Sequence, residues 1–242
     1  MAVDLILVIT LTTLIQSMFG VGVLLFGTPA LLLLGYDFIP ALVILLPISV
    51  TINLLQILKH HVHTDLNFVK DVLRFTIPGV VVFLFIASSG IINITFLVGA
   101  FLIFIALKSV AKPARDTLNW LINHESLYLM VMGVIHGLTN LGGSLLTAIV
   151  HGKNYPKDRT RVTIALCYAM LACFQLVTLT WLGEIKSVPY SDTISLLQWA
   201  VVVFLITEEM VYRQLDNHKY QMIFTVFLLA SGLLLLWKSL ST

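Results

Sequence analysis

Polar residues and glycines interrupt two otherwise apolar stretches of the sequence, 5–35 and 126–152. The first break reads Gln16-Ser17-Met18-Phe19-Gly20-Val21-Gly22, and the second reads His136-Gly137-Leu138-Thr139-Asn140-Leu141-Gly142-Gly143-Ser144. A helix that starts after such a break presents unpaired backbone N–H groups and roughly half a positive charge. Glycines also let a ligand approach the backbone closely. The chemistry that these residues predict is therefore the noncovalent binding of a small oxyanion.

Amide, hydroxyl and imidazole side chains in and near the breaks could add hydrogen bonds to such an anion. No aspartate or glutamate lies near the middle of any long apolar segment, whereas cation pumps and proton relays usually need a carboxylate there. The candidate substrate-binding residues are Gln16, Ser17, Phe19, Gly20, Val21, Gly22, Asn53, Gln56, His136, Thr139, Asn140, Gly142, Gly143, Ser144 and Gln175. They also have plainer interpretations, because glycines permit close helix packing and buried amides or imidazoles can simply bond a neighbouring helix.

The composition indicates which solvent surrounds the chain. Of the 242 residues, 59% are hydrophobic and 11% are charged, whereas a soluble domain carries roughly 25% charged residues. A water-soluble protein could not bury so much apolar surface, so we expect an integral membrane protein. The first residues, Met1-Ala2-Val3-Asp4, lack the basic region of a cleaved signal peptide, so we expect the first apolar stretch to be retained.

Charge-poor segments predict six spanning helices, since a helix needs roughly 20 apolar residues to cross about 30 Å of hydrocarbon. These segments are 38–58, 69–88, 92–108, 162–182, 193–211 and 220–237. The broken stretch 5–35 would measure about 46 Å as one continuous helix, which is too long to cross comfortably. We therefore expect two half-helices there, which either turn back as a re-entrant hairpin or continue across.

The basic residues favour a hairpin for the second broken stretch. Cytoplasmic loops carry an excess of Lys and Arg. If both broken stretches crossed the membrane, the basic residues would divide almost evenly between its two sides. If 126–152 instead returns to its starting side, every basic residue except Lys186 and Lys238 lies on one side. This arrangement puts the basic loops in the cytoplasm and the C-terminus outside.

Internal symmetry suggests the same solution for the first broken stretch. Asn140 lies 120 positions after Gly20, and weaker matches follow at similar offsets. We therefore expect an all-α polytopic membrane protein with two inverted repeats, 1–115 and 116–242, in one integral membrane domain. Each repeat would comprise a broken re-entrant helical hairpin plus three transmembrane helices, and inverted repeats are common in secondary transporters. The alternative is eight conventional transmembrane helices.

Charged residues and histidines outside the breaks carry plainer expectations. Arg159 and Arg161 belong to the most basic loop, and retention of that loop in the cytoplasm would explain them. Glu208 lies near the end of a span, where it would meet Arg213 or solvent. The histidines of 60–63 are adjacent and lack a further set of ligands, so we expect neither a metal site nor a cofactor.

The residues Phe19-Gly20-Val21-Gly22, followed by Thr28-Pro29-Ala30-Leu31-Leu32 and Gly35, resemble a motif of the TauE/SafE family of sulfite and organosulfonate permeases. That family repeats a motif like F-G-(I/V)-G-G-G in each half, and 137–144 occupy the matching place in the second half. There are two departures from the motif. Val23 stands where a further glycine would be expected, and Thr139-Asn140 replace Phe-Gly in the second copy.

The resemblance implies transport of a small sulfur-containing anion, such as sulfite, sulfoacetate or a related sulfonate, across a bacterial inner membrane. We expect a secondary transporter rather than an enzyme, working by alternating access at a midplane site formed by the two breaks. Its partners would be the anion and the lipid bilayer, with no nucleic acid. The alternatives are an intramembrane hydrolase that uses Ser144 and His136, and a structural membrane subunit. The sequence context of Ser144 does not suit a nucleophile, and a structural subunit would not need duplicated broken helices.

Overall fold

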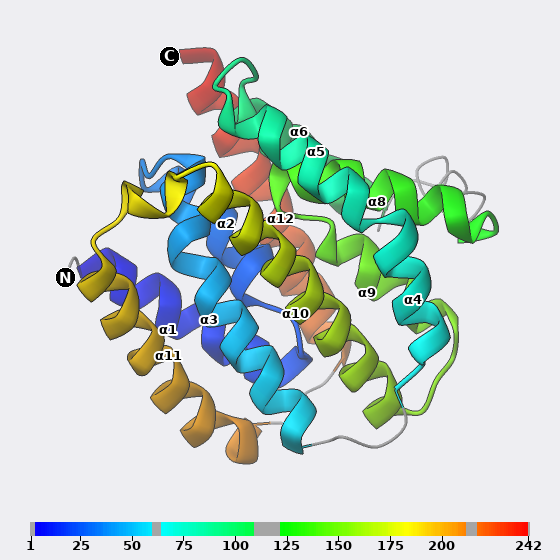
Figure 1. Ribbon diagram of the computed structural model, residues 1–242. Helices are drawn as coiled ribbons and strands as arrows, with labels where there is room; N and C mark the ends of the chain where they lie inside the picture. Colours follow the sequence, from blue (N-terminus) through cyan, green and yellow to red (C-terminus); the bar gives the residue numbers. More distant parts are fainter. Residues whose placement is uncertain (1–2, 60–63, 109–121, 212–216, 242) are drawn as a thin grey trace.

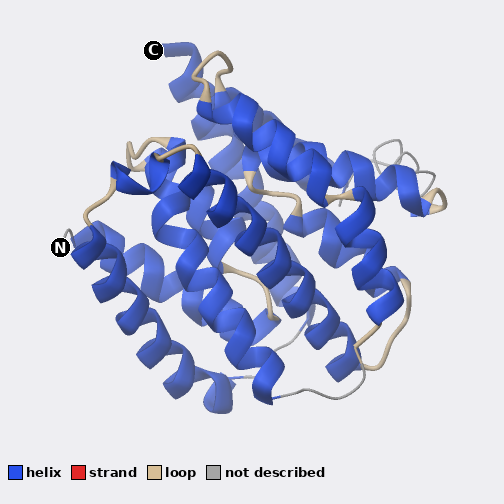
Figure 2. Cartoon of the chain, viewed as in Figure 1, coloured by secondary structure: helices blue, strands red, loops and turns tan. Residues whose placement is uncertain are grey.

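The computed structural model describes residues 3–59, 64–108, 122–211 and 217–241, which form helices and loops without a strand (Figure 1, Figure 2). The helices of the first half are α1 (Val3–Phe19), α2 (Val23–Leu33), α3 (Phe38–Lys59), α4 (Leu66–Phe75), α5 (Ile77–Ser88) and α6 (Ile94–Lys108). Those of the second half are α8 (Glu125–Thr139), α9 (Gly143–Gly152), α10 (Lys157–Trp181), the 3-10 helix η1 (Glu184–Ser187), α11 (Tyr190–Val211) and α12 (Asn217–Ser241). The all-helical prediction is confirmed for the described residues.

Helices occupy all six predicted spans. Within the described residues, four segments are long and apolar enough to cross a membrane, namely Phe38–Lys59, Leu66–Ser88, Asp158–Trp181 and Tyr190–Glu208. Shorter apolar helices include α1, α2, α6 and α9 and the last part of α12. This pattern is that of a polytopic membrane protein.

Two of the spans have boundaries that the apolar pattern did not predict. Helix α10 begins at Lys157, directly after Pro156, and so includes charged residues that precede the predicted span. The segment 69–88 is divided, because α4 ends at Phe75 and α5 begins one residue before Pro78. Proline lacks an N–H group and disfavours helical geometry in the residue before it, which explains the bend between α4 and α5 in Figure 1.

The two predicted breaks separate α1 from α2 and α8 from α9. The hydroxyl of Tyr36, which follows α2, donates a hydrogen bond of 2.9 Å to Asp4 in the first turn of α1. In the second half, Lys153 follows α9 and forms an ion pair of 2.9 Å with Glu125, the first residue of α8. In both halves, the residues that follow the second half-helix therefore lie beside the start of the first.

The helices pack through a few pairs and through glycines at their contacts. α3 packs against α10, α6 against α12, α1 against α11, and α5 against α8. At the α5–α8 contact, a Cβ on Gly133 would collide with the carbonyl oxygen of Thr76. At the α6–α12 contact, a Cβ on Gly232 would lie 2.9 Å from the carbonyl oxygen of Gly99. Glycine is required at both contacts because the two backbones approach so closely.

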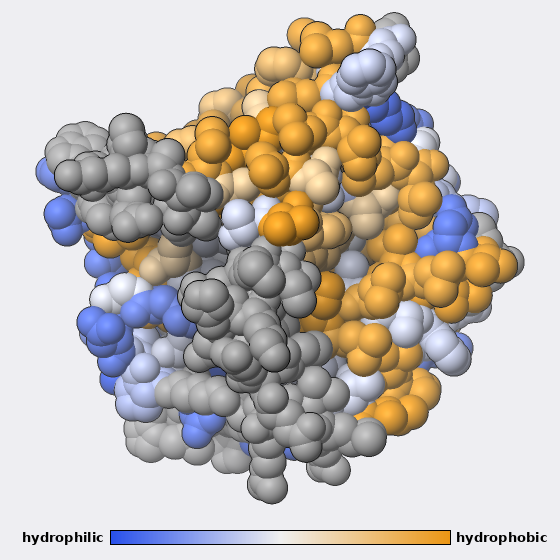
Figure 3. All heavy atoms as spheres, turned by 180° about the vertical axis from the view of Figure 1, so that it is seen from behind, coloured by the Kyte–Doolittle hydropathy of each residue, from blue (hydrophilic) through white to orange (hydrophobic). Residues whose placement is uncertain are grey.

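The described residues bury polar side chains and expose apolar ones. The buried polar group includes Thr12, Thr13, Gln16, Ser17, Thr28, Ser49, Asn53, Gln56, His136, Asn140 and Gln175. The exposed apolar group includes Val82, Phe85, Phe96, Val177, Trp181, Leu205, Ile206, Leu234 and Trp237. Figure 3 shows large hydrophobic areas on one face of the molecule. An apolar exterior of this extent fits lipid rather than water as the surrounding solvent.

The end of α12 holds the end of α2 in place. Nζ of Lys238 on α12 donates a hydrogen bond of 2.8 Å to the carbonyl oxygen of Leu32. The last carbonyl groups of a helix have no partner within that helix, and Lys238 satisfies one of them in α2. Asn93, just before α6, likewise donates a hydrogen bond of 2.8 Å to Ser239.

The substitution Gly133→Ala tests the close contact between α5 and α8. The added methyl group would meet the Thr76 carbonyl oxygen, and overpacking of this kind costs about 1–3 kcal/mol. We expect the midpoint of thermal unfolding in detergent to fall by several degrees. Gly152→Ala is the matched control, since nothing lies within 4 Å of the added atom. Equal losses in both variants would contradict a close contact specific to Gly133.

Candidate functional site

The first break ends α1 with a glycine in the left-handed conformation. Gly20 has a φ of 75°, and its N–H donates a hydrogen bond of 2.8 Å to the carbonyl oxygen of Gln16. Two residues later, a Cβ on Gly22 would lie 2.5 Å from the backbone nitrogen of Gln16 and 2.7 Å from the Thr12 carbonyl oxygen. Gly20 is therefore required by its backbone angle, and Gly22 by close contact with α1.

The side chain of Gln16 fixes the shape of the first break. Its Nε2 donates hydrogen bonds of 3.1 Å to the Gly20 carbonyl oxygen and to Oδ1 of Asn53. Its Oε1 accepts a hydrogen bond of 3.1 Å from the N–H of Val23, at the start of α2. Nε2 of Gln56 donates to the carbonyl oxygen of Gln16 at 3.3 Å. The two amides on α3, Asn53 and Gln56, therefore hold the first break against that helix.

The second break repeats this geometry with asparagine in place of glycine. Asn140 has a φ of 61°, and its N–H donates a hydrogen bond of 2.8 Å to the carbonyl oxygen of His136. Asparagine tolerates the left-handed conformation better than most residues, so Asn140 can end α8 as Gly20 ends α1. A Cβ on Gly142 would lie 2.5 Å from Cβ of His136 and 3.0 Å from the Met132 carbonyl oxygen. The departure from the glycine motif thus preserves the backbone geometry.

His136 and Gln175 form a buried pair beside the second break. Nε2 of His136 lies 3.1 Å from Oε1 of Gln175 on α10, and both residues are fully buried. His136 Nδ1 and Gln175 Nε2 have no hydrogen-bond partner in the described part of the chain. If His136 is neutral, either orientation of the Gln175 amide leaves one donor and one acceptor of the pair unsatisfied. Such atoms are costly to bury unless a ligand or water meets them.

A hydrogen bond connects the second break to α2. Nδ2 of Asn140 donates to Oγ1 of Thr28 at 2.9 Å, and both residues are buried. Oδ1 of Asn140 has no partner among the described residues. The second break therefore meets the middle of α2 rather than the glycines of the first break.

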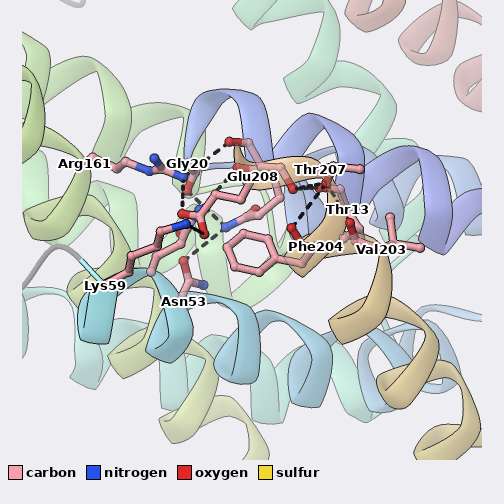
Figure 4. A network of polar contacts seen from close by, with 12 residues as sticks. Thr13, Gly20, Asn53, Lys59, Arg161, Val203, Phe204, Thr207 and Glu208 are labelled. Atoms are coloured by element: carbon pink, nitrogen blue, oxygen red, sulfur yellow. Dashed lines mark hydrogen bonds and ion pairs between the residues drawn. The ribbon is translucent and has the colours of Figure 1, made fainter. Parts of the chain in front are cut away.

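Charged side chains that the sequence did not assign to the site lie against the first break (Figure 4). Nη2 of Arg161 lies 3.0 Å from Oε1 of Glu208 and donates a hydrogen bond of 3.3 Å to the carbonyl oxygen of Ser17. Nζ of Lys59 lies 3.2 Å from Oε2 of Glu208. We call Arg161, Glu208 and Lys59 the ionic cluster. The first break therefore has full charges beside it.

The ionic cluster corrects two expectations. Glu208, expected to meet Arg213 or solvent, is only 4% exposed and pairs with Arg161 and Lys59, whereas Arg213 lies outside the described residues. Arg161, expected in a loop, lies within α10 and is 6% exposed. A carboxylate inside an otherwise apolar span needs a partner, and this signal could have indicated a buried cation.

Contacts along α10 show how far apart the two breaks lie. Cγ of Arg161 would be 3.3 Å from a Cβ on Gly20, and the Tyr168 hydroxyl occupies the space that a Cβ on Gly143 would need. Residues 161 and 168 are about 10 Å apart along a helix. The predicted residues thus form two groups at neighbouring depths, joined through Asn140 and Thr28. The first group is Gln16, Ser17, Gly20, Val21, Gly22, Asn53 and Gln56, and the second is His136, Thr139, Asn140, Gly142, Gly143, Ser144 and Gln175.

The predicted hydroxyl groups mainly bond the local backbone. Oγ of Ser17 donates to Thr13 O and lies 2.8 Å from Oγ1 of Thr207, Oγ1 of Thr139 donates to Ile135 O, and Oγ of Ser144 donates to Leu141 O. Ser144 and His136 therefore bond different partners and not each other. The side chain of Phe19 and the histidines of 60–63 lie outside the described residues.

Comparison with known proteins agrees with this architecture. The family model described as sulfite exporter TauE/SafE matches residues 5–238, which is nearly the whole chain. No match was found among curated proteins or among solved structures. The apolar helices and the family together indicate a multi-pass membrane transporter. The chain belongs to the TauE/SafE family of sulfite exporters.

Proposed function

We propose that this protein is a secondary transporter that moves sulfite, sulfoacetate or a related sulfonate across the inner membrane. The two broken helices would form the substrate site near the middle of the bilayer, where the second break meets α2, and the protein would work by alternating access around it. The observation that carries this proposal is the hydrogen bond between Asn140 and Thr28, which brings one break against the half-helix that follows the other. The family supports a sulfur-containing anion as substrate.

An anion suits the polar groups near the second break. The Gln175 amide has an unsatisfied N–H or carbonyl beside His136, and the half-helix α9 starts next to them. The start of a helix favours negative charge through its free N–H groups and its dipole. Among the Asp and Glu residues whose side chains the structure describes, only Glu208 is buried, and it is paired with two cations. We therefore place the substrate against Asn140, Gly142, Gly143, His136 and Gln175.

We further propose that the halves 1–115 and 116–242 are inverted repeats. The packing pairs support this, because α1 packs on α11 as α8 packs on α5, while α3 packs on α10 and α6 on α12. The equivalent angles of Gly20 and Asn140 support it at residue level. The proposed boundary at 115 lies outside the described residues.

We infer that α1–α2 and α8–α9 are re-entrant hairpins that enter from opposite sides of the membrane. The Tyr36–Asp4 and Lys153–Glu125 contacts support a return of each hairpin to its own side. Most basic residues would then face the cytoplasm, with Lys238 and the C-terminus outside. An inside-negative membrane potential would favour export of an anion.

Substitutions of Asn140 separate backbone geometry from side-chain contact. Asn140→Leu removes the amide and puts a bulky residue in the left-handed conformation, so we expect loss of most sulfite flux into liposomes. Asn140→Gly keeps the backbone angle and loses only the amide, so it should retain the fold and part of the flux. Flux equal to that of the unaltered protein in both variants would mean that the second break only packs helices.

Gln175→Met tests the buried pair directly, because it keeps most of the side-chain volume and removes both the carbonyl and the NH2 group of the amide. A hydrogen bond to a charged group contributes about 1.5–3 kcal/mol, so KM for sulfite should rise about tenfold or more. Liposome flux at varied sulfite concentration measures this change. Cys173→Ala, at an exposed position on the same helix, is the control and should leave KM unchanged. An unchanged KM in Gln175→Met would exclude this amide from the substrate site.

A further inference from the structure

The ionic cluster lies where three helices meet the end of α1. Arg161 belongs to α10, Glu208 to α11 and Lys59 to α3. The Arg161 guanidinium donates to the carbonyl oxygen of Ser17 near the end of α1, and its stem lies against Gly20. Figure 4 shows Arg161 and Lys59 approaching Glu208 from different helices. The cluster therefore connects the first break to the helices around it.

The cluster combines two basic side chains with one carboxylate. Among the Asp, Glu, Lys and Arg residues whose side chains the structure describes, only Arg161 and Glu208 are buried, at 6% and 4% exposure. The Lys59 side chain is 42% exposed and reaches the same carboxylate from the edge of the cluster. Burying an ion pair seldom stabilises a protein more than apolar packing would. A charge kept inside a membrane protein usually marks a site of function.

We propose that Arg161 is a second anion-binding position, and that the Glu208 carboxylate occupies the place that the transported anion takes there. This proposal rests on the proposed function, since it assumes that an oxyanion passes the first break. A carboxylate and a sulfite or sulfonate group both accept hydrogen bonds from a guanidinium through paired oxygens. An incoming anion can therefore replace Glu208 on Arg161 without leaving the guanidinium unpaired.

Replacement of Glu208 would also loosen the first break. Glu208 and its neighbour Thr207 connect the last part of α11 to α1, Glu208 through Arg161 and Thr207 through a contact of 2.8 Å with Ser17. When an anion takes over Arg161, the link through Glu208 is released and the Thr207–Ser17 contact remains, so the last part of α11 holds α1 less tightly. The cluster then couples the arrival of an anion to a looser contact between α1 and α11.

The test measures the binding of sulfite to the full chain in detergent. Binding is detected as a shift in the thermal unfolding temperature, at constant ionic strength and with chloride as the reference anion. Arg161→Gln should raise the Kd for sulfite about tenfold or more, because it removes a charged donor. Glu208→Gln removes the internal competitor, so the Kd should fall about threefold or more. Without sulfite, Glu208→Gln should unfold at a lower temperature, and sulfite should raise that temperature more than in the unaltered protein.

Arg159→Gln is the matched control, because it removes an equal charge two positions away. Arg159 lies 3.8 Å from Asp65 and does not touch the break, so its loss should leave the Kd unchanged. If Arg161→Gln does not fold, Arg161→Lys keeps the charge and should weaken binding through loss of the paired geometry. Equal Kd values in the Arg159 and Arg161 variants, or weaker binding in Glu208→Gln, would overturn the proposal.

Sulfite flux into liposomes, measured on the same variants, separates this proposal from the proposed function. In one outcome, the unaltered protein transports sulfite while the Arg159 and Arg161 variants show the same KM. This result would overturn the role of Arg161 and leave the proposed transport function standing. Binding that depends on Arg161 without any flux would overturn transport and leave the anion position standing. If the unaltered protein neither binds nor moves sulfite, both proposals fail.

Discussion

The hydrocarbon core of a bilayer offers no water to a backbone N–H or carbonyl group, so every interruption of a helix there needs partners from the protein itself. The first break meets this requirement largely through one residue, because Gln16 bonds the Gly20 carbonyl oxygen on one side and the Val23 N–H on the other. Beside the first break Oε1 of Gln56 has no partner among the described residues, and beside the second break atoms of Asn140, His136 and Gln175 have none. The second break therefore has more polar atoms that a ligand could satisfy, which is why we propose the substrate there.

The same constraint shapes the packing around the breaks. Polar side chains turn inward to bond the interrupted backbone, and apolar side chains face outward toward lipid. Lipid tails are as apolar as leucine, so burial of apolar surface does little to hold helices together in a membrane. Close backbone contact can replace it, as at Gly133 against Thr76 and at Gly99 against Gly232. Glycines thus serve two purposes in this chain, bending the backbone at Gly20 and bringing helices together elsewhere.

Much of the architecture could be predicted from the sequence because apolar length and composition report directly on lipid. The six spans and the positions of both breaks follow from such runs and from the glycines within them. The division at Pro78 and the early start of α10 at Lys157 were missed, because an apolar window reports the length of a span and not its local geometry. The carboxylate of Glu208 indicates a buried cation but does not identify it, since Arg161 lies 47 residues away in the chain. The relative depths of the two breaks could not be predicted, because they depend on contacts with α10 that have no periodic pattern in the sequence.

Lys238 connects two helices that are far apart in the sequence, α12 and α2. Its ammonium group donates a hydrogen bond to the Leu32 carbonyl oxygen across a sequence separation of 206 residues. The last turn of α12 therefore binds the end of α2. This contact of α2 can form only after α12 has been synthesised and inserted. The packing of α2 is therefore completed only after the helices that lie between α2 and α12 in the sequence have been made.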